Sequence, residues 1–181
     1  MTNGSRTEVD YFECLRLKPW VTATLRVKYE GVAPNALPAK AAFLRDSNDY
    51  DSVWAVCDVD EFDVASAVLE AAGKEVGLAL SNPCFEIWLL LHVNNKCGGF
   101  NNCSQVERSL RRHIPTWDNS RLNFANFRDG VMIAVERAKR LDQAPDANPS
   151  TAVWRIVEDL TLPGSSENEV SAHEFVTLAP W

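Results

Sequence analysis

Short apolar runs alternate with amphipathic stretches through the first half of the chain. Residues 53–57 and 76–80 have the length and composition of buried strands, and residues 61–72 repeat apolar side chains at helical spacing before Gly73. Residues 21–29, rich in Val, Thr and Leu, predict a further strand. Because strands that alternate with helices are typical of parallel sheets with crossover helices, the pattern predicts an α/β fold.

The other periodic stretches predict helices around this sheet. Apolar side chains recur in them every three or four residues, and Asn148 followed by Pro149 is typical of a helix start. The expected helices cover residues 8–18, 39–45, 131–141 and 149–160.

The chain is expected to form one domain with two parts. Its 181 residues match the usual size of a domain. The predicted sheet core covers about residues 1–92 and the helical part about residues 93–160. Residues 161–181 show no clear period, which predicts an extended or mobile tail.

Two acidic residues directly follow the first predicted central strand, in Asp58-Val59-Asp60. Side chains two residues apart on a strand point to the same side, so both carboxylates are expected at one spot past the strand's carboxyl end. Ligands bind at this edge of open α/β sheets. Because Mg²⁺ takes oxygens from one or two carboxylates and from substrate phosphates, Asp58 and Asp60 are candidate metal ligands. The pair is also compatible with solvated turn acids.

A second polar segment follows the next predicted strand. Asn82 has the character of a helix N-cap and Pro83 that of a first helical residue. The helix after them is apolar on nearly every face, so it is expected to be buried. Glu86 carries the only formal charge between Ser81 and Leu91. A buried carboxylate needs a hydrogen bond, an ion pair or a metal, so Glu86 is either a third acidic site residue or a helix-capping glutamate.

Four blocks of the chain, in this order and spacing, resemble the RloB family. The most specific block is SNPCFEIWLLLH; the others are weak singly and stronger in combination. The resemblance extends from about residue 3 to about residue 160. The blocks are GSRTEVDYF (residues 4–12), YDSVWAVCDVDE (50–61), SNPCFEIWLLLH (81–92) and NPST (148–151).

The resemblance implies a Toprim-like fold, a Rossmann-like and mostly parallel sheet flanked by helices, with a helical C-terminal half. The RloB family is regarded as similar to the catalytic domains of topoisomerases, primases and OLD-type nucleases. Its members are found beside restriction-modification genes and with AAA-type ATPase partners. The resemblance therefore implies a nuclease that depends on Mg²⁺ (or Mn²⁺) and acts in defence against phage or foreign DNA. The expected substrate is a nucleic acid, DNA or tRNA, and the sequence does not distinguish the two.

One position departs from the family pattern. Toprim-like domains carry a glutamate at the end of their first strand, and Asn3 stands in that place here. An amide binds Mg²⁺ less well than a carboxylate and cannot act as a general base. The apolar run of the first strand is also absent before Asn3, so either the chain start lies further upstream or this copy is degenerate. Glu8 is a substitute candidate, with a helix-capping role as the alternative.

The candidate site therefore combines acids with polar residues from the third block. The catalytic candidates are Glu8, Asp58, Asp60 and Glu86. Ser81, Asn82 and His92 are candidates for contact with the substrate, and His92 is equally compatible with a structural role.

Charge is distributed unevenly along the chain. The net charge of −7 argues against a protein that coats nucleic acid through charge alone. Residues 104–140 nevertheless hold eight basic residues against four acids, which is typical of a polyanion partner or of a solvated helix face. Arg108, Arg111 and Arg112 share a helix face through their spacing, which suits phosphate contact.

Apolar stretches, cysteines and nucleotide-binding motifs narrow the class of protein further. No apolar stretch reaches the length of a membrane span, and the N-terminus lacks the regions of a signal peptide. The five cysteines, an odd number, predict reduced, buried thiols in a cytoplasmic protein. No Walker-type loop occurs, so any ATP hydrolysis is expected from a partner.

Two hypotheses for the function follow. The first is a Mg²⁺-dependent nuclease that is impaired by Asn3. The second is a non-catalytic interaction subunit that keeps the fold and binds an ATPase partner or nucleic acid.

Overall fold

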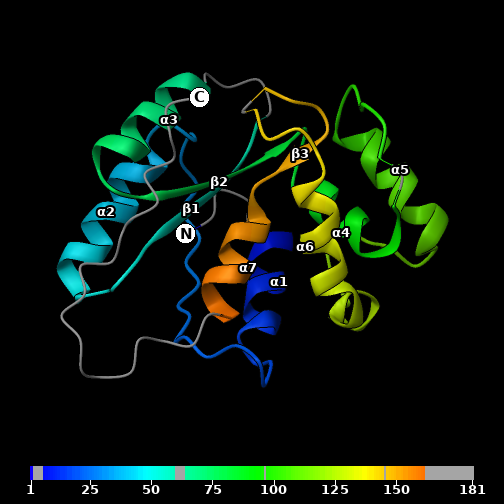
Figure 1. The fold of residues 1–181 in the computed structure, drawn as a ribbon, viewed down its shortest axis with the longest axis horizontal. Coiled ribbons are helices and arrows are strands. Elements are labelled where there is room, and N and C mark those ends of the chain that lie inside the picture. The colour runs from blue at the N-terminus through cyan, green and yellow to red at the C-terminus, as the bar shows by residue number, and fades with distance from the viewer. Residues whose placement is uncertain (2–5, 60–63, 96, 145, 162–181) are drawn as a thin grey trace.

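Two short parallel strands lie at the centre of the molecule, between two groups of helices (Figure 1). The computed structural model describes residues 1, 6–59, 64–95, 97–144 and 146–161. In these ranges β1 (Trp54–Asp58) and β2 (Gly77–Asn82) pair in parallel, and α3 (Val64–Gly73) lies between them in the chain. The predicted strand–helix–strand unit is therefore confirmed.

Both outer edges of this strand pair are hydrogen-bonded. Beyond β2, the two residues of β3 (Ser150–Thr151) pair antiparallel with its end. Beside β1, the Met1 ammonium donates to the Trp54 carbonyl at 2.6 Å, and the Val56 N–H donates to the Met1 carbonyl at 2.8 Å. Burial lowers the pKa of the Met1 amine to about 6. The first residue of the chain therefore lies along β1 as a neighbouring strand would.

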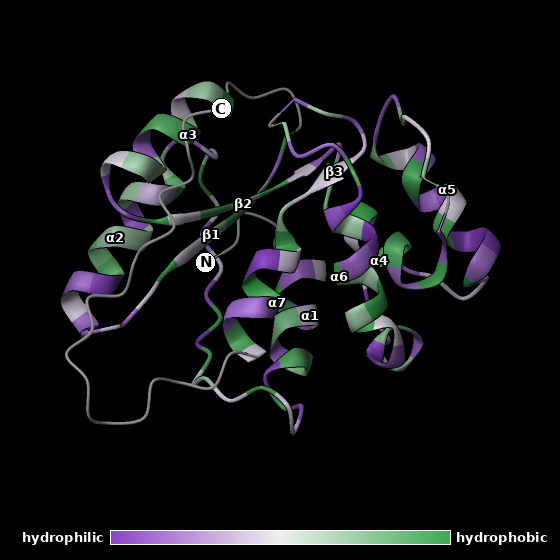
Figure 2. Ribbon diagram, viewed as in Figure 1, coloured by the Kyte–Doolittle hydropathy of each residue, from purple (hydrophilic) through white to green (hydrophobic). Residues whose placement is uncertain are grey.

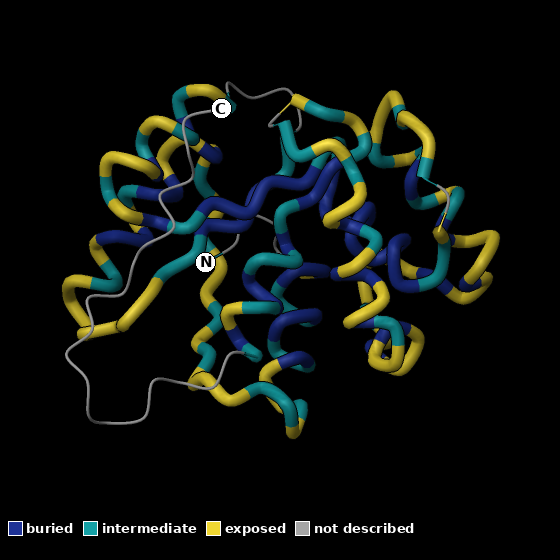
Figure 3. The backbone as a smooth tube through the Cα atoms, viewed as in Figure 1, coloured by how far each residue is buried: buried dark blue, intermediate teal, exposed yellow. Residues whose placement is uncertain are grey.

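Alternate side chains of the two strands enter different apolar layers, as the two-residue period of a strand requires. Ala55 and Leu78 join a buried cluster with α2 (Leu37–Asn48) and α3. Val56 and Ala79 join the larger cluster on the other side. The middle residues of both strands are buried, and the strands appear as the dark blue centre of Figure 3.

The larger cluster is formed by helices from both halves of the chain. Its centre is α4 (Glu86–Val93), whose consecutive residues Ile87 to Leu91 are all buried, so the predicted burial of this helix is confirmed. In Figure 2, α5 and α6 alternate hydrophilic and hydrophobic residues, as expected of helices that cover a core. The helices around α4 are α1 (Thr7–Leu15), α5 (Cys103–His113), α6 (Val131–Lys139) and α7 (Val153–Thr161), with two short 3₁₀ turns at Phe124–Asn126 and Arg128–Gly130.

The mixed α/β class is confirmed, but the described sheet is small and only partly parallel. The strand predicted over residues 21–29 is wrong, because this segment bonds to the end of α7 instead: the Thr22 N–H donates to the Leu160 carbonyl at 3.1 Å. The helix start predicted at Pro149 is also wrong, because Ser150 and Thr151 pair with β2 and the helix begins at Val153. No helix within the described ranges is long and apolar enough to cross a membrane.

Candidate functional site

Acidic side chains from three elements surround the carboxyl end of β1. Asp58 is the last residue of β1, Glu8 lies in the first turn of α1, and Glu86 is the first residue of α4. The side chains of Glu8 and Glu86 are enclosed, with residue exposures of 5% and 8%. Asp60 and Asn3, which the sequence places in the same site, lie outside the described residues.

Asp58 is fixed by a hydrogen bond to the start of α4. Its Oδ1 accepts the backbone N–H of Phe85, the residue before the helix, at 2.8 Å. A carboxylate in this position satisfies one of the free N–H groups of a helix start and interacts favourably with the helix dipole. The helix therefore begins at Glu86, and the sequence-based prediction of Asn82 as N-cap and Pro83 as first helical residue is wrong.

Glu86 has an unusual protonation equilibrium. Burial, together with the neighbouring charges of Glu8 and Glu107, raises the pKa of Glu86 to about 7, against the hydrogen bonds from its own N–H and from Thr7. Burial also raises the pKa of Glu8. No lysine or arginine in the described part of the chain forms an ion pair with either residue. Two buried carboxylates without a cationic partner require a proton or a metal ion.

The donor types of this site fit a hard cation. Carboxylate oxygens are the ligands that Mg²⁺ and Mn²⁺ take in proteins, commonly one or two from the protein with the rest from water and substrate. Within the described ranges, no three carboxylates have oxygens that all lie within 4.8 Å of one another. The described carboxylates therefore offer such a cation at most two groups whose oxygens lie this close together.

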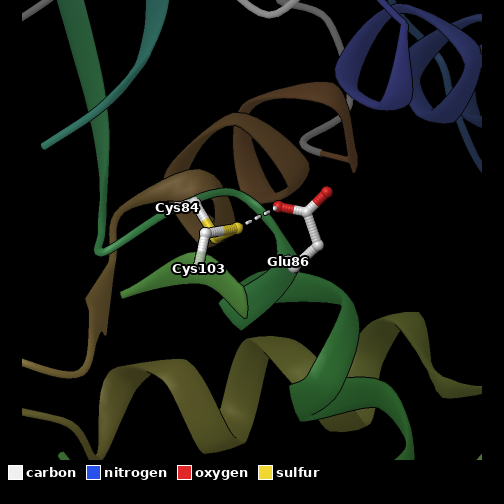
Figure 4. A group of neighbouring side chains, drawn as sticks. All are labelled: Cys84, Glu86 and Cys103. Atoms are coloured by element: carbon white, nitrogen blue, oxygen red, sulfur yellow. Dashed lines mark hydrogen bonds between the residues drawn. A yellow bond between two sulfur atoms is a disulfide. The ribbon is translucent and has the colours of Figure 1, made fainter. Parts of the chain in front are cut away.

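A disulfide lies beside the acidic residues. Cys84 and Cys103 are bonded, with their Cα atoms 5.6 Å apart, and the Cys103 Sγ lies 3.3 Å from Oε2 of Glu86 (Figure 4). The prediction of reduced thiols is wrong for these two residues, because the segment before α4 and the start of α5 bring them together. The thiols of Cys14, Cys57 and Cys97 are free, and burial raises the pKa of each.

Three residues predicted to contact the substrate, Ser81, Asn82 and His92, form side-chain hydrogen bonds within the protein. Ser81 is fully buried, and its hydroxyl is 2.9 Å from that of Thr151. The Asn82 side chain donates to the Asp146 carbonyl at 3.1 Å, which ties the end of β2 to the loop before β3. The ring of His92 is 3.1 Å from the Tyr11 hydroxyl and 2.8 Å from the Trp88 carbonyl, so neither nitrogen is free for a phosphate.

The arginines predicted to contact phosphate separate into two kinds. Arg111 forms an ion pair with Glu107 at 3.0 Å, one turn away on α5. Arg108 and Arg112 are exposed and, with Phe100 and Gln105, line a hollow of about 250 Å³. Within the described residues neither of the two forms an ion pair. These two guanidinium groups are the part of the predicted patch that remains available to an anion.

Comparison with known protein families identifies the chain. The model of the family described as RloB-like protein matches residues 1–160. This chain belongs to the RloB-like family. No curated protein and no solved structure matches it. The matched range includes β1, α4 and every residue of the candidate site in this RloB-like protein.

The RloB-like site also contains residues that sequence reasoning missed. Thr7 donates to the Asn119 carbonyl at 3.4 Å and contributes to the pKa of Glu86. Thr151 lies opposite Ser81 on β3. Both lie in blocks that resemble the family, GSRTEVDYF and NPST, but their hydrogen-bond partners lie 70 or more positions away, so no local pattern predicted these contacts. The Cys84–Cys103 bond joins residues 19 positions apart, and no recognisable motif predicted it.

The buried His92 of this RloB-like chain should make the stability of the fold depend on pH. Burial lowers the pKa of His92 to about 4, against about 6.5 in an unfolded chain. The unfolded state then binds the extra proton first, so His92 costs stability as pH falls from 6.5 toward 4. We expect the stability deficit of a His92→Gln variant, measured by urea unfolding, to shrink by about 2 to 3 kcal/mol between pH 7 and pH 4.5.

Glu86 contributes to the pH dependence of stability with the opposite sign, but it is present in both the unmodified chain and the His92→Gln variant. Its contribution therefore cancels in the difference between their free energies of unfolding. A deficit that stays constant over this range would show that His92 titrates as a solvent-exposed histidine does.

Proposed function

We propose that this RloB-like protein is a Toprim-like, metal-dependent nuclease that cleaves nucleic-acid phosphodiester bonds in defence against phage or foreign DNA. The observation that carries the proposal is the pair of buried carboxylates, Glu8 and Glu86, together with Asp58, which ends a parallel strand and accepts the N–H of Phe85, the residue before Glu86. Perturbed carboxyl groups at this edge of an α/β sheet are typical of catalytic sites.

The residues divide into two roles. Asp58 and Asp60 hold Mg²⁺ or Mn²⁺, which when bound neutralises charge on the reacting phosphate. Glu86, with a pKa of about 7, is partly protonated at neutral pH and is suited to give a proton to the leaving oxygen, whereas the general base of the family pattern is replaced by Asn3. Burial is the main cause of this raised pKa, and the negative charge of Glu8 adds to it. The bonded start of α4 maintains Asp58 and Glu86 in a fixed relation.

The substrate contact proposed for this site lies on α5. Arg108 and Arg112 pair with phosphates, and the ring of Phe100 in the same hollow offers a surface on which a base can stack. Two guanidinium groups and an aromatic ring contact phosphates and the face of a base, so they bind a nucleic acid with little preference for its base sequence. This combination supports a nucleic acid, DNA or tRNA, as the substrate.

The metal site is tested by Asp58→Asn. We expect this variant to lose measurable Mn²⁺ binding in calorimetry, because it removes a charged oxygen ligand from a site with few others. The amide oxygen still accepts the Phe85 N–H, so the free energy of unfolding should stay within about 0.5 kcal/mol.

Asp58→Ala is the matched control. It removes both the metal ligand and the acceptor of the Phe85 N–H, so it should also lower the free energy of unfolding by about 1 kcal/mol. The Asp60→Asn variant is expected to lose Mn²⁺ in the same way. An unchanged Mn²⁺ affinity in the double variant, Asp58→Asn with Asp60→Asn, would contradict the proposed metal site.

The activity itself is tested by incubating the chain with DNA and with tRNA in Mg²⁺ or Mn²⁺. Cleavage that requires the cation and is lost in Glu86→Gln supports the nuclease. The second candidate, an interaction subunit for an AAA-type ATPase partner, is favoured by Asn3 and by the free Arg108 and Arg112. Nucleic-acid binding without cleavage in every variant, together with binding to such a partner, would support it instead.

A further inference from the structure

A pair of cysteines and a carboxylate converge where α4 and α5 begin (Figure 4). Within the described ranges Cys84, Glu86 and Cys103 are the one set of three metal-ligand side chains whose donor atoms all lie within 4.8 Å of one another. In this structure the two sulfurs are joined, and a disulfide sulfur has no thiolate to give to a metal. The oxidised chain therefore gathers three donors of which only the carboxylate is usable.

We propose that Cys84, Glu86 and Cys103 form a redox-controlled zinc site, which binds Zn²⁺ when the two cysteines are reduced and is closed by their disulfide. The inference shares Glu86 with the nuclease proposal but does not rest on it, because zinc binding by the reduced chain requires neither Mg²⁺ nor nucleic acid.

The observed spacing suits tetrahedral zinc. With Zn–S bonds of about 2.3 Å and Zn–O bonds of about 2.0 Å, a sulfur and an oxygen ligand lie about 3.5 Å apart. The Cys103 Sγ and the Glu86 Oε2 are 3.3 Å apart. Two thiolates on one zinc lie about 3.8 Å apart, a separation that rotation of the two cysteine side chains can provide while their Cα atoms remain near 5.6 Å.

The donors are held by defined parts of the fold. Glu86 is the first residue of α4 and Cys84 lies two positions before it, while Cys103 is the first residue of α5. The start of α5 is fixed by the Asn102 side chain, which accepts the N–H of Gln105 at 3.2 Å. Cys84 and Glu86 are buried, and Cys103 is half-buried. A reductant or a metal ion can therefore approach from the Cys103 side.

The chemistry balances with a dithiol as reductant. The reductant's thiolate attacks the Cys84–Cys103 bond and leaves as its own cyclic disulfide, which yields two cysteine thiols. Zn²⁺ then displaces the two thiol protons and binds both thiolates and the Glu86 carboxylate. Three protein ligands leave the fourth position to water. Thiolate donors favour zinc over Mg²⁺, so the ion proposed here differs from that of the phosphodiester site.

The test uses the full chain in both redox states. The chain is reduced with a dithiol, freed of reductant without oxygen, and titrated with Zn²⁺ against a chromophoric chelator. We expect one Zn²⁺ per reduced chain and at least about a hundredfold weaker binding by the oxidised chain, which lacks both thiolates. Glu86→Gln should weaken zinc binding by about tenfold or more. Cys97→Ser, which removes a free thiol elsewhere, is the matched control and should leave it unchanged.

A second measurement needs no substitution. Zn²⁺ should protect Cys84 and Cys103 of the reduced chain from alkylation, with Cys97 modified at the same rate in either case. The absence of zinc binding by the reduced chain, equal affinity in both redox states, or alkylation of Cys84 and Cys103 unaffected by zinc would each overturn the proposal. None of these results depends on nucleic-acid cleavage, so a failure here is separate from a failure of the nuclease.

Discussion

Replacing Asn3 with glutamate is expected to raise Mg²⁺-dependent cleavage by about a hundred- to ten-thousand-fold, the usual contribution of a general base. The unmodified chain should be a poor nuclease or an inactive one, because Asp58 and Asp60 can hold a cation while position 3 offers only an amide. Position 3 lies outside the described residues, and the prediction rests on the match of residues 3–8 to the family pattern. Initial rates of DNA and tRNA cleavage at saturating Mg²⁺ give the comparison.

Asn3→Gln is the control for this gain, since it adds the same side-chain length without a charge and should leave the rate unchanged. Adding Asp58→Asn to Asn3→Glu should abolish the gained activity, which links the new carboxylate to the metal site. Strong cleavage by the unmodified chain that is insensitive to substitution at positions 3 and 8 would show that the general base lies elsewhere.

The second large effect concerns the core. Trp88→Ala should lower the free energy of unfolding by about 3 to 5 kcal/mol, the usual cost of truncating an enclosed aromatic residue. Trp88 is fully buried on α4, and its ring lies 6.2 Å from that of Tyr11 and 5.0 Å from that of His92. Urea or thermal unfolding measures the change.

Leu69→Ala on α3 is the matched control, because Leu69 is 75% exposed and its truncation should change stability by less than about 0.5 kcal/mol. Equal effects of the two substitutions would contradict the burial of α4 at the centre of the core.

The elements that the sequence predicted well are those with a strong local pattern. The runs that became β1 and β2, and the unbroken apolar stretch of α4, reveal their burial without knowledge of any partner. The position of Asp58 at a strand end follows from β1 alone. The helical and strand periods of the apolar residues were enough to predict these elements.

The errors occur where distant partners decide the structure. Residues 21–29 have a strand-like composition, but the N–H of Val21 bonds to Lys18 and that of Thr22 to the end of α7, not to a neighbouring strand. Ser150 and Thr151 form a strand of two residues, too short for any period, because the end of β2 lies beside them. Cys84 and Cys103 are 19 positions apart with no recognisable motif, so their bond could be found only from the fold.

The enclosure of α4 has a consequence for motion as well as for stability. An amide hydrogen exchanges through the opening reaction of lowest free energy. In an element that is enclosed on all sides, no local opening has a lower free energy than global unfolding. Helix α4 contacts α5, α6 and β2, and its residues from Ile87 to Leu91 are buried. Its amides should therefore be the slowest to exchange in the chain, well behind those of α3. Glu86 is the first residue of this helix and Asp58 is bonded to Phe85 just before it, so the candidate site is attached to the part of the described structure that we expect to fluctuate least.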